Sequence, residues 1–512
     1  MTIGNIIRQN ALKYKNKPAV MFQNTQLTYD ELNNRANRLA NALLNRGYQK
    51  GDKVAVFMKN HGVHAEIIVA LSKIGVIFVP INYRLVGPEI DYIIRHSDSR
   101  GIILTAEYAD DVGALLTDLP QLDTVIVVGE TALEKTLDYE KLLEQASTSE
   151  PKMEVTEADT FYIGYTSGTT GKPKGVVISH KSRVVTSMAA AFEYKIDDND
   201  VHLVGGPIYH AAPLIFLVTQ LIVGGTIVIH ETFKPDKVLK DIERYQITNM
   251  FLAPTMYNFL VNIETKVKQQ FDISSMRVLI SAGSPLATKS KEDIQDFFTN
   301  VDLHEFYGST ESAITLNIKP RDINRKDRSV GLPFPLVECL LLDENKEVVP
   351  QGEIGELYFK GPYLLDTYYK NPEETAKCFH NGYFSVGDMG VQDAEGFYSI
   401  VDRKKDMLIS GGVNIYPRDI EEVLYTHPNI LDVAVIGVPD PVWGESVKAI
   451  VVLRDNENLT EKEVIQFCEG KIAGYKKPRS VSFLAELPRN PSGKILKNEL
   501  RNHYWENTES KI

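Results

Sequence analysis

Cysteine is scarce in this sequence. Its three cysteines, Cys339, Cys378 and Cys468, lie far apart and form no CxxC pair. This pattern fits a protein of a reducing compartment and offers no cysteine-based metal site.

Positive charge is also in short supply. The chain carries 56 lysines and arginines against 68 aspartates and glutamates, which gives a net charge of -12. Because a nucleic-acid backbone binds to a basic surface, this balance argues against nucleic acid as the main partner. A local basic patch would still serve a small phosphorylated ligand.

Long hydrophobic runs are missing as well. The N-terminal segment "MTIGNIIRQNALKYKNKP" lacks the apolar core of a secretory signal. The longest apolar stretch, residues 67–81, is interrupted by Ser72, Lys73 and Gly75 and is too short to span a bilayer. It predicts the end of a helix followed by a buried strand. We therefore expect a cytoplasmic protein without a transmembrane segment.

What is present, over the first half, is an alternation of helices with short apolar strands. Thr28 and Glu31 form a capping box for a helix that Gly47 ends. The apolar segments that predict buried strands here are "KVAVFM", "VIFVPI", "GIILT" and "TVIVV". Such alternation predicts an α/β fold with parallel sheet.

The chain of 512 residues is too long for one ordinary core, so we expect more than one domain. From about residue 330, alternating apolar and polar residues around turns predict a small antiparallel β unit. A shorter α/β mixture follows "DRKKD" at 402–406. The predicted division is a large N-terminal domain, 1–405, of α/β subdomains with the small β unit, and a small C-terminal α/β domain, 406–512.

A glycine-rich segment, "YTSGTTGKPKG" at 165–175, predicts a phosphate-binding loop. It is not the common GxxxxGK[ST] loop, because Pro173 follows Lys172 and the next residues predict a strand rather than a helix. Glycines let successive backbone N–H groups form an anion-binding nest, to which hydroxyl and lysine side chains add donors. The alternative is a ligand-free Gly/Ser/Thr hairpin, which the order of these residues disfavours.

This segment resembles the phosphate loop of the adenylate-forming superfamily of acyl-CoA synthetases, adenylation domains and luciferases. The other motifs of that superfamily follow in order over nearly the whole chain: "YHAAPL" (209–214), "SAGSPL" (281–286), "EFYGSTES" (305–312), "YFSVGD" (383–388), "IVDRKKDMLISGGVNIYP" (400–417) and "PRNPSGKILK" (488–497). Within the superfamily the chain is most similar to free-standing bacterial fatty acyl-CoA synthetases.

The resemblance implies ATP-dependent ligation of a carboxylic acid to coenzyme A, with Mg²⁺, through an acyl-AMP intermediate and with release of AMP and pyrophosphate. It favours a medium- or long-chain fatty acid. Three alternatives stay open: an adenylation enzyme that loads a carrier protein, a CoA ligase for an aromatic acid, and a phosphate-releasing NTPase or kinase. The apolar segment 214–225 suits an alkyl tunnel and a core helix equally.

The resemblance also implies catalytic roles. Glu311 would hold Mg²⁺ with Thr166 nearby, His210 would orient the acyl carboxylate, and Lys494 would bridge the carboxylate and the α-phosphate. A lone glutamate, histidine or lysine is ordinarily a surface or core residue, so position within the motifs carries these assignments.

For the nucleotide, the resemblance implies that Tyr307 stacks on adenine and that Asp388 and Arg403 reach the ribose. Two departures from the pattern, Ser385-Val386 before Gly387-Asp388 and Ser284 in "SAGSPL", leave these contacts less defined. The full predicted set is Thr166, Ser167, Gly168, Thr169, Thr170, Gly171, Lys172, Lys174, Ala282, Gly283, Ser284, Glu305, Phe306, Tyr307, Gly308, Ser309, Thr310, Asp388, Ile400, Arg403 and Lys494.

For coenzyme A and the acid, further residues follow from the resemblance. The predicted coenzyme A residues are Ser410, Gly411, Gly412, Tyr475, Lys476 and Lys477, although a charge run is often only a solvated face. The predicted acyl-binding residues are His210, Ala211, Leu214 and Gly308. The small domain is expected to rotate about a hinge at Lys405 between the two half-reactions. We expect small-molecule partners only, and leave homodimer formation and peripheral membrane contact open.

Overall fold

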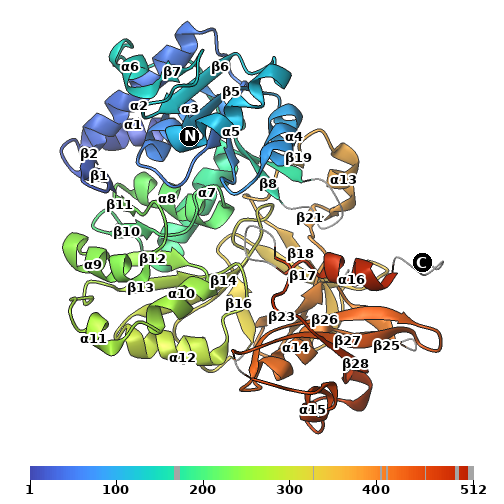
Figure 1. Ribbon diagram of the computed structural model, residues 1–512. Coiled ribbons are helices and arrows are strands. Elements are labelled where there is room, and N and C mark those ends of the chain that lie inside the picture. Colours follow the sequence, from blue (N-terminus) through green and yellow to red (C-terminus); the bar gives the residue numbers. More distant parts are fainter. Residues whose placement is uncertain are drawn as a thin grey trace. The chain divides into compact units, whose positions relative to one another are not determined.

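The chain divides into two compact units. The computed structural model describes residues 1–166, 173–326, 328–403, 406–410, 413–455, 457–489 and 495–505 (Figure 1). One unit is formed by Met1–Cys339 with Phe359–Phe384, and the other by Leu340–Tyr358 with Ser385–Ile512. The boundary predicted after residue 405 falls within the sequence of the second unit and stays a prediction.

Local sequence signals set the helix α2 (Tyr29–Asn45) as expected. Thr28 caps it by accepting a hydrogen bond from the Glu31 N–H, and the Glu31 carboxylate accepts one from the Thr28 N–H at 2.8 Å. Gly47, just past the helix, has a φ of 77°, which glycine adopts readily. The predicted capping box is confirmed.

The first sheet of the first unit carries the predicted apolar strands. Its strand order is β19-β9-β8-β4-β3-β5-β6-β7, parallel from β8 to β7 and antiparallel where β9 joins β8 and β19. The strands are β3 (Lys53–Phe57), β4 (Ile77–Ile81), β5 (Ser99–Thr105), β6 (Thr124–Val128), β7 (Leu137–Asp138), β8 (Thr160–Thr166), β9 (Lys174–Ser179) and β19 (Thr367–Tyr368). The predicted parallel sheet is confirmed.

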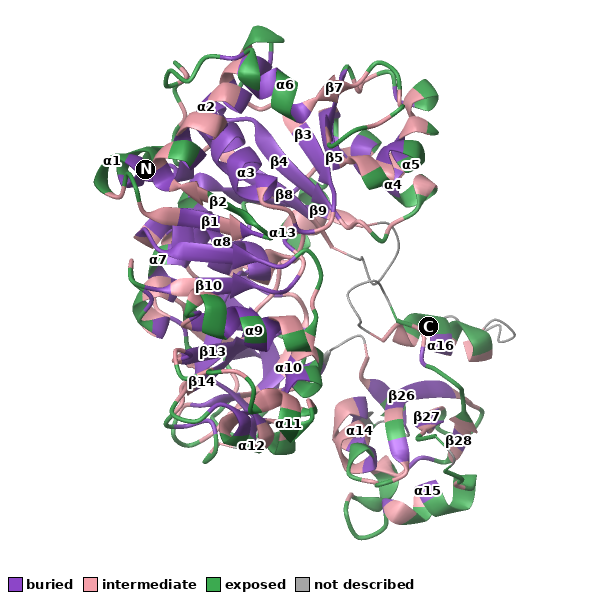
Figure 2. Cartoon of the chain, turned by 60° about the vertical axis from the view of Figure 1, so that its left-hand side comes forward, coloured by how far each residue is buried: buried purple, intermediate pink, exposed green. Residues whose placement is uncertain are grey.

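Helices cover both faces of this sheet, so its central strands are apolar throughout (Figure 2). Ala55 and Phe57 of β3 pack with α4 and α5, whereas α3 is buried along its whole length beside β4. The helix-then-strand prediction for residues 67–81 is thereby confirmed. The helices of this part are α1 (Ile3–Lys13), α2, α3 (Val63–Ile74), α4 (Gly87–Ser97), α5 (Ala109–Gly113) and α6 (Tyr139–Glu144).

The second sheet of the first unit has the order β2-β1-β11-β10-β12-β13-β14-β15-β16. Its strands run parallel from β1 to β14 and antiparallel at the β2, β15 and β16 additions. They are β1 (Pro18–Phe22), β2 (Thr25–Thr28), β10 (Val201–Val204), β11 (Thr226–Ile229), β12 (Asn249–Leu252), β13 (Val278–Ser281), β14 (Asp302–Tyr307), β15 (Leu316–Ile318) and β16 (Ser329–Pro333).

This sheet also has a core on each face. Met250 and Leu252 pack with α9, α10 and α12, while Phe251 between them packs with α7 and α8, as the alternation of a strand requires. The helices of this part are α7 (His180–Tyr194), α8 (Ala211–Val223), α9 (Pro235–Tyr245), α10 (Pro254–Val261), α11 (Thr265–Lys268) and α12 (Thr288–Phe297).

The second unit holds two β arrangements. The predicted small antiparallel unit consists of β17 (Glu338–Leu342), β18 (Ile354–Lys360), β22 (Asp388–Gln392) and β23 (Tyr398–Arg403), with antiparallel pairing of β18 with β22 and of β22 with β23. The other is a sheet of β24 (Leu408–Ser410), β25 (Val413–Ile415), β26 (Ile430–Asp440), β27 (Gly444–Leu453) and β28 (Ser480–Phe483). Helices α14 (Pro417–Tyr425) and α15 (Glu461–Phe467) share one core with this sheet, and α16 (Lys497–Trp505) shares another.

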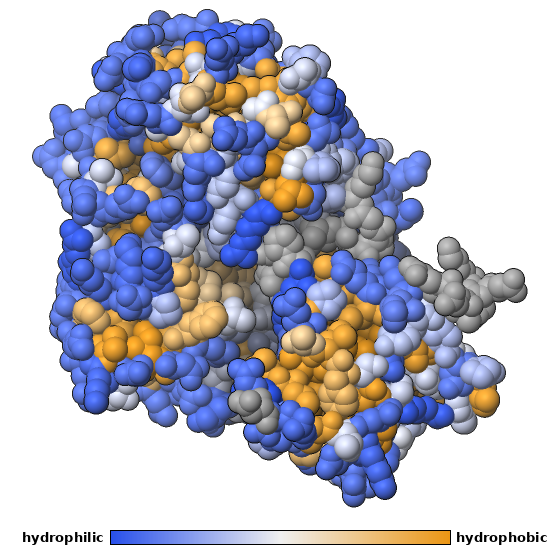
Figure 3. Space-filling view, viewed as in Figure 1, coloured by the Kyte–Doolittle hydropathy of each residue, from blue (hydrophilic) through white to orange (hydrophobic). Residues whose placement is uncertain are grey.

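Hydrophilic residues make up most of the surface seen in Figure 3, in keeping with the net charge of -12. Among the described residues, no helix is long and apolar enough to cross a membrane.

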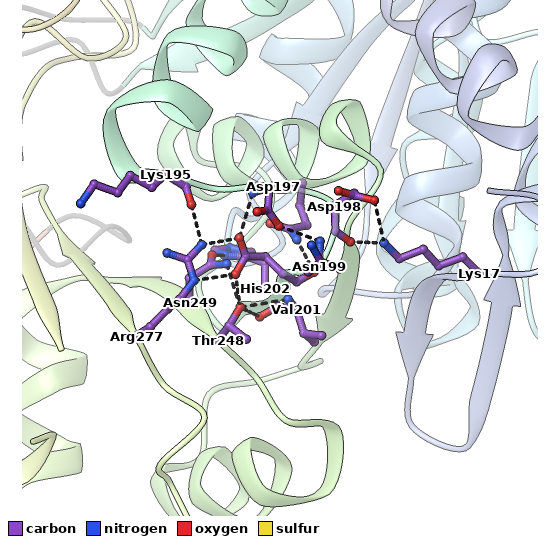
Figure 4. Close-up of polar contacts among 12 residues, drawn as sticks. Lys17, Lys195, Asp197, Asp198, Asn199, Val201, His202, Thr248, Asn249 and Arg277 are labelled. Carbon is purple, nitrogen blue, oxygen red and sulfur yellow. Dashed lines mark hydrogen bonds and ion pairs between the residues drawn. The ribbon is translucent and has the colours of Figure 1, made fainter. Parts of the chain in front are cut away.

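A polar network ties the starts of three neighbouring strands of the second sheet together (Figure 4). Asp200, which precedes β10, is buried, and its carboxylate accepts hydrogen bonds from Thr248 Oγ1 at 2.6 Å and from the backbone N–H of Asp197 at 2.8 Å. Arg277, which precedes β13, donates to the same carboxylate through Nε at 2.9 Å and also through Nη2. One buried charge is thus satisfied by groups from three segments of the chain.

We predict that Arg277→Met lowers the stability of the first unit by about 2–3 kcal/mol, because it leaves the Asp200 carboxylate buried without its cation. The cost falls below that of a fully buried pair, since the Arg277 side chain is 37% exposed. The control is Arg95→Met, which removes an exposed pair with Asp91 and should cost under about 1 kcal/mol. Thermal unfolding followed by calorimetry measures both, and equal losses would show that the network adds nothing.

Candidate active site

The glycine-rich segment connects two antiparallel strands. Strands β8 and β9 form a hairpin in which Thr166 lies opposite Lys174. This confirms the prediction of a loop between two strands. The residues of the loop itself, 167–172, lie outside the described part of the chain, and their nucleotide roles stay predictions.

Both ends of this hairpin loop are fastened to neighbouring elements. On helix α4, the Tyr92 hydroxyl donates a hydrogen bond to the Pro173 carbonyl at 3.1 Å. From the same helix, His96 Nδ1 lies 2.8 Å from the Tyr165 hydroxyl. The backbone N–H of Tyr369 donates to the Gly175 carbonyl at 2.7 Å. These contacts fix the positions from which the loop starts and to which it returns.

Lys174, a predicted nucleotide residue, is held by partners of its own unit. Its ammonium group lies 2.6 Å from the Glu374 carboxylate on α13 (Pro372–Lys377) and 5.1 Å from the centre of the Tyr368 ring. The hydrogen bond from Lys174 is the main cause that lowers the pKa of Glu374. The arrangement places a cation at the base of the hairpin, and its contact with nucleotide stays a prediction.

Glu311 is a buried carboxylate whose partner in the described part of the chain is a tyrosine hydroxyl. Its side chain is 9% exposed, and its Oε1 accepts a hydrogen bond from the Tyr368 hydroxyl at 2.9 Å. Among the described residues, no lysine or arginine forms an ion pair with it. Since a buried anion is costly unless a positive charge compensates it, this donor chemistry fits a divalent cation.

The structure brings the segment before Glu311 to the hairpin. A Cβ added at Gly164 would lie 2.7 Å from Tyr162 Cε2 and 3.3 Å from Thr310 Cγ2, so Thr310 packs directly over the strand. Gly164 is two residues before Thr166, whose side chain is half-buried. A side chain at this position would press closely on Tyr162 of the same strand and tightly on Thr310, so the position favours glycine.

Within the described residues, no group of three or more histidine, cysteine, aspartate or glutamate side chains forms a metal cluster. A Mg²⁺ ion bound together with a nucleotide needs only one or two protein oxygens, because the phosphates supply further ligands. Glu311 and Thr166 are the side chains predicted to hold such an ion.

The "SAGSPL" turn presents an open face. Gly283 has a φ of 96°, and its Cβ position meets nothing within 4 Å. Gly283 and Ser284 are exposed, whereas Ala282 is buried in the core. A flat ring could therefore approach Gly283, while Ala282 supports the turn from within; nucleotide contact of all three stays a prediction.

The carboxylate of Glu305 is buried and has two partners within the protein. Its carboxylate accepts a hydrogen bond from the Leu286 N–H at 2.9 Å and pairs with Lys291 at 2.9 Å, with both side chains buried. This pair fixes the end of the "SAGSPL" turn to β14. Sequence reasoning missed Lys291, because nothing in the motif spacing marks a residue of α12.

The remaining residues of "EFYGSTES" differ in exposure. Tyr307 is half-buried and its ring lies 5.9 Å from that of Phe359, whereas Phe306 is buried in the core. A Cβ on Gly308 would lie 1.8 Å from the Ala313 carbonyl oxygen, so the turn alone requires glycine there. Ser309 Oγ accepts a hydrogen bond from the Ser312 N–H at 3.1 Å. The ligand roles of these residues stay predictions.

His210 stands at the N-terminus of the 13-residue helix α8. Burial, followed by the nearby Arg84, lowers its pKa to about 4, so the imidazole is neutral at neutral pH. Its ring packs 4.4 Å from that of Tyr209. Ala211 is partly exposed, but Leu214 is fully buried in the helix interior, and the segment from Pro213 to Ile222 forms a core helix.

In the second unit, the predicted ribose residues lie on paired strands. Asp388 begins β22 and is opposite Arg403 of β23, and Ile400 lies opposite Gly390. Asp388 is buried to 6% exposure. The backbone thus places the two ribose residues side by side, which their separation in sequence does not reveal.

The predicted coenzyme A residues are distributed over the second unit. Ser410 ends β24 and is opposite Val413, with Gly411 and Gly412 outside the described residues. Tyr475 is 52% exposed.

The two lysines beside Tyr475 are paired within their own unit. Lys476 contacts Asp419 at 2.5 Å and Lys477 contacts Glu469 at 3.0 Å. A grip on coenzyme A phosphates would require them to exchange these partners, and it stays a prediction.

Lys494 and the hinge residue Lys405 also lie outside the described residues. The segment that carries Lys494 is closed at its base by an antiparallel bridge between Arg489 and Ile495. Beyond it, Lys497 of α16 pairs with Glu421 of α14 at 2.7 Å, and both are largely buried. The ends of the lysine segment are therefore anchored to the body of the unit.

Comparison with known proteins agrees with this geometry. Residues 7–369 match the model of the AMP-binding enzyme family, and residues 419–494 match that of the AMP-binding enzyme C-terminal domain. The chain is 36% identical over 492 residues to a feruloyl-CoA synthase from Amycolatopsis, covering 95% of this chain and 96% of that protein. It is 35% identical over 512 residues to the long-chain-fatty-acid–CoA ligase FadD13 from Mycobacterium tuberculosis, covering 98% of each.

A solved structure shares the fold. The crystal structure of ATP-bound MatB from Rhodopseudomonas palustris superposes with a TM-score of 0.89 at 30% identity, covering 98% of this chain and 99% of that one. The predictions of a mixed α/β architecture and of an enzyme of the acid–CoA ligase type are confirmed. The chain belongs to the AMP-binding enzyme family, the adenylate-forming superfamily that its ordered motifs predict.

Proposed function

We propose that the protein joins a medium- or long-chain fatty acid to coenzyme A through an acyl-AMP intermediate. The observation that carries the proposal is the buried carboxylate of Glu311, which pairs with no described lysine or arginine and accepts a hydrogen bond from Tyr368. The preceding residue, Thr310, packs against the glycine-rich hairpin. This arrangement suits a bound nucleotide accompanied by a divalent cation.

The reaction has two balanced steps. In the first, a carboxylate oxygen attacks the α-phosphorus of ATP, and the bond to pyrophosphate breaks. In the second, the thiolate of coenzyme A attacks the acyl carbon, and the bond to AMP breaks. Magnesium, when bound, neutralises phosphate charge; Glu311 and Thr166 are the residues proposed to hold it.

His210 and helix α8 support the first step from the side of the acid. A neutral imidazole with a pKa lowered to about 4 can form a hydrogen bond with the carboxylate without trapping it in an ion pair. The positive end of the α8 dipole also favours negative charge at that point. Both features orient the attacking oxygen while leaving it reactive.

A fatty acid is proposed because the relative FadD13 is a long-chain-fatty-acid–CoA ligase and covers nearly the whole chain. An aromatic acid is the second candidate, favoured by the similarity to a feruloyl-CoA synthase. The buried α8 serves the core in either case, so the pocket must begin at its partly exposed N-terminal residues His210 and Ala211. A cytoplasmic location is proposed on the free state of all three cysteines.

The acid is identified by a panel of saturated and aromatic acids assayed for pyrophosphate release and thioester formation. For an alkyl tunnel, kcat/KM should rise about fourfold per added methylene until the tunnel is filled, from about 0.8 kcal/mol per buried CH₂. Ferulate outperforming every fatty acid would instead assign the aromatic candidate. Transfer to a holo-carrier protein but not to free coenzyme A would overturn the ligase proposal.

We predict that Glu311→Gln slows acyl-AMP formation by about 10²-fold or more, the effect of losing one electrostatic stabiliser of the transition state. The matched control is Glu373→Gln, an exposed carboxylate of α13. Pyrophosphate release at saturating Mg²⁺ measures both variants. A Glu311→Gln enzyme as fast as the control would remove Glu311 from the metal site.

The two half-reactions are proposed to use different parts of the second unit. Lys494→Ala should abolish acyl-AMP formation yet still convert supplied acyl-AMP and coenzyme A to thioester. Two other variants should keep acyl-AMP formation and lose thioester formation: Lys405→Pro, which fixes φ at the predicted hinge, and Gly412→Leu, which places a bulky side chain at a predicted coenzyme A residue. Lys462→Ala, at an exposed lysine of α15, serves as the control. Equal loss of both half-reactions in a folded Lys494→Ala protein would contradict the division.

A further inference from the structure

Tyr368 contacts the carboxylate of Glu311 from outside every motif that the sequence marks. It lies on β19, where its backbone pairs with Val176 of β9, and Val176 pairs in turn with Gly164 of β8. Its side chain is 4% exposed, and its hydroxyl donates to Glu311 Oε1 at 2.9 Å. Tyr368 therefore contacts Glu311, the candidate metal ligand, from a strand that is added to β9 of the β8–β9 hairpin.

The two oxygens of the Glu311 carboxylate have different surroundings. Oε1 is occupied by the Tyr368 hydroxyl, whereas Oε2 has no partner among the described residues. The hydrogen bond holds Oε1, and the rest of the side chain holds the carboxylate carbon. Because both are held, the direction of Oε2 is set as well. Oε2 is the atom left to meet a cation.

The same segment also fixes the backbone of Glu311. The N–H of Leu365, three residues before Tyr368, donates to the Glu311 carbonyl at 2.6 Å. Tyr368 is itself anchored, because its N–H donates to Thr375 Oγ1 at 2.9 Å and its ring lies under the Lys174 ammonium. Both ends of Glu311 are thus held by a short stretch that is in turn tied to β9 and α13.

We infer that Tyr368 is a positioning residue that orients Glu311 so that Oε2 presents to the magnesium of Mg·ATP. The inference rests on the proposed function. Hydrogen bonds that orient a metal-ligating side chain typically change metal affinity by 10–100-fold when they are lost. Phenylalanine removes only the hydroxyl and keeps the ring under the Lys174 ammonium, so the effect should be confined to the carboxylate.

The test compares Tyr368→Phe with wild type by calorimetric titration of ATP at a series of Mg²⁺ concentrations. We expect the Mg²⁺ concentration for half-maximal ATP binding to rise about 10–100-fold. Binding of Mn²⁺ in the presence of a non-hydrolysable ATP analogue, followed by electron paramagnetic resonance, should weaken in parallel. The second half-reaction from supplied acyl-AMP should keep its KM for coenzyme A.

The control is Tyr257→Phe, which deletes another fully buried hydroxyl, one that donates to the Ile280 carbonyl at 3.1 Å. No Mg²⁺ shift is expected there, and an equal shift would overturn the inference by showing a general structural effect. Tyr368→Leu gives a second loss of the hydroxyl if the phenylalanine variant does not fold.

A double-mutant cycle with Glu311→Gln separates the inference from the proposed function. If Tyr368 acts through Glu311, the Tyr368→Phe change should add no further Mg²⁺ shift in the Glu311→Gln background. An unchanged Mg²⁺ requirement in Tyr368→Phe, with a raised one in Glu311→Gln, overturns the positioning role alone. An unchanged requirement in Glu311→Gln overturns the metal site of the proposed function.

Discussion

A carboxylate kept in a buried position, with a hydroxyl on one oxygen and no described cationic side chain beside it, constrains the rest of the site. Glu311 meets this description, since it is 9% exposed and touches Tyr368 but no described lysine or arginine. A buried negative charge is costly unless a positive charge compensates it, so a carboxylate in these surroundings fits a cation. The preceding residue, Thr310, packs close to Gly164 of the hairpin, so Glu311 follows directly on a contact with that strand.

The fold holds its central strands in place by packing against both of their faces. Both sheets of the first unit are packed on each face, so β8, β13 and β14 are held from two sides, while Gly283 and Ser284 just after β13 are exposed. The Asp200 network secures the opposite ends of the strands of the second sheet. Rigidity within the sheets and openness at the turns are what an active site at strand ends requires.

The sequence predicted much of the fold because its signals are local. Short runs of consecutive residues determine the helix cap at Thr28 and Glu31 and the apolar strands. The same holds for the strand, loop and strand of the glycine-rich segment. Tyr368 escaped prediction because its importance comes from register: it meets Glu311 only because β19 adds to β9. His96 escaped because it contacts Tyr165 from a helix distant in sequence, and Lys291 escaped because no motif marks the helix that carries it.

Site residues were predicted by position in ordered motifs, and the structure separates those that face outward from those that face inward. Gly283 is exposed and Tyr307 is half-buried, whereas Glu305, Phe306 and Leu214 are buried. Motif spacing does not distinguish exposed residues from buried ones, because a residue that supports a turn is spaced as regularly as one that touches a ligand. Only side-chain direction and packing, which sequence spacing does not encode, tell them apart.

The central claim is that the acid is activated as an acyl adenylate. The most direct measurement uses a carboxylic acid labelled with ¹⁸O in both carboxylate oxygens, incubated with the protein, Mg·ATP and coenzyme A, with mass spectrometry of the nucleotide products. The account predicts one ¹⁸O atom in AMP and none in pyrophosphate, because the attacking oxygen stays on the α-phosphorus when the thioester forms. Label in inorganic phosphate together with ADP would contradict it, since the acid would then have been activated at the terminal phosphate.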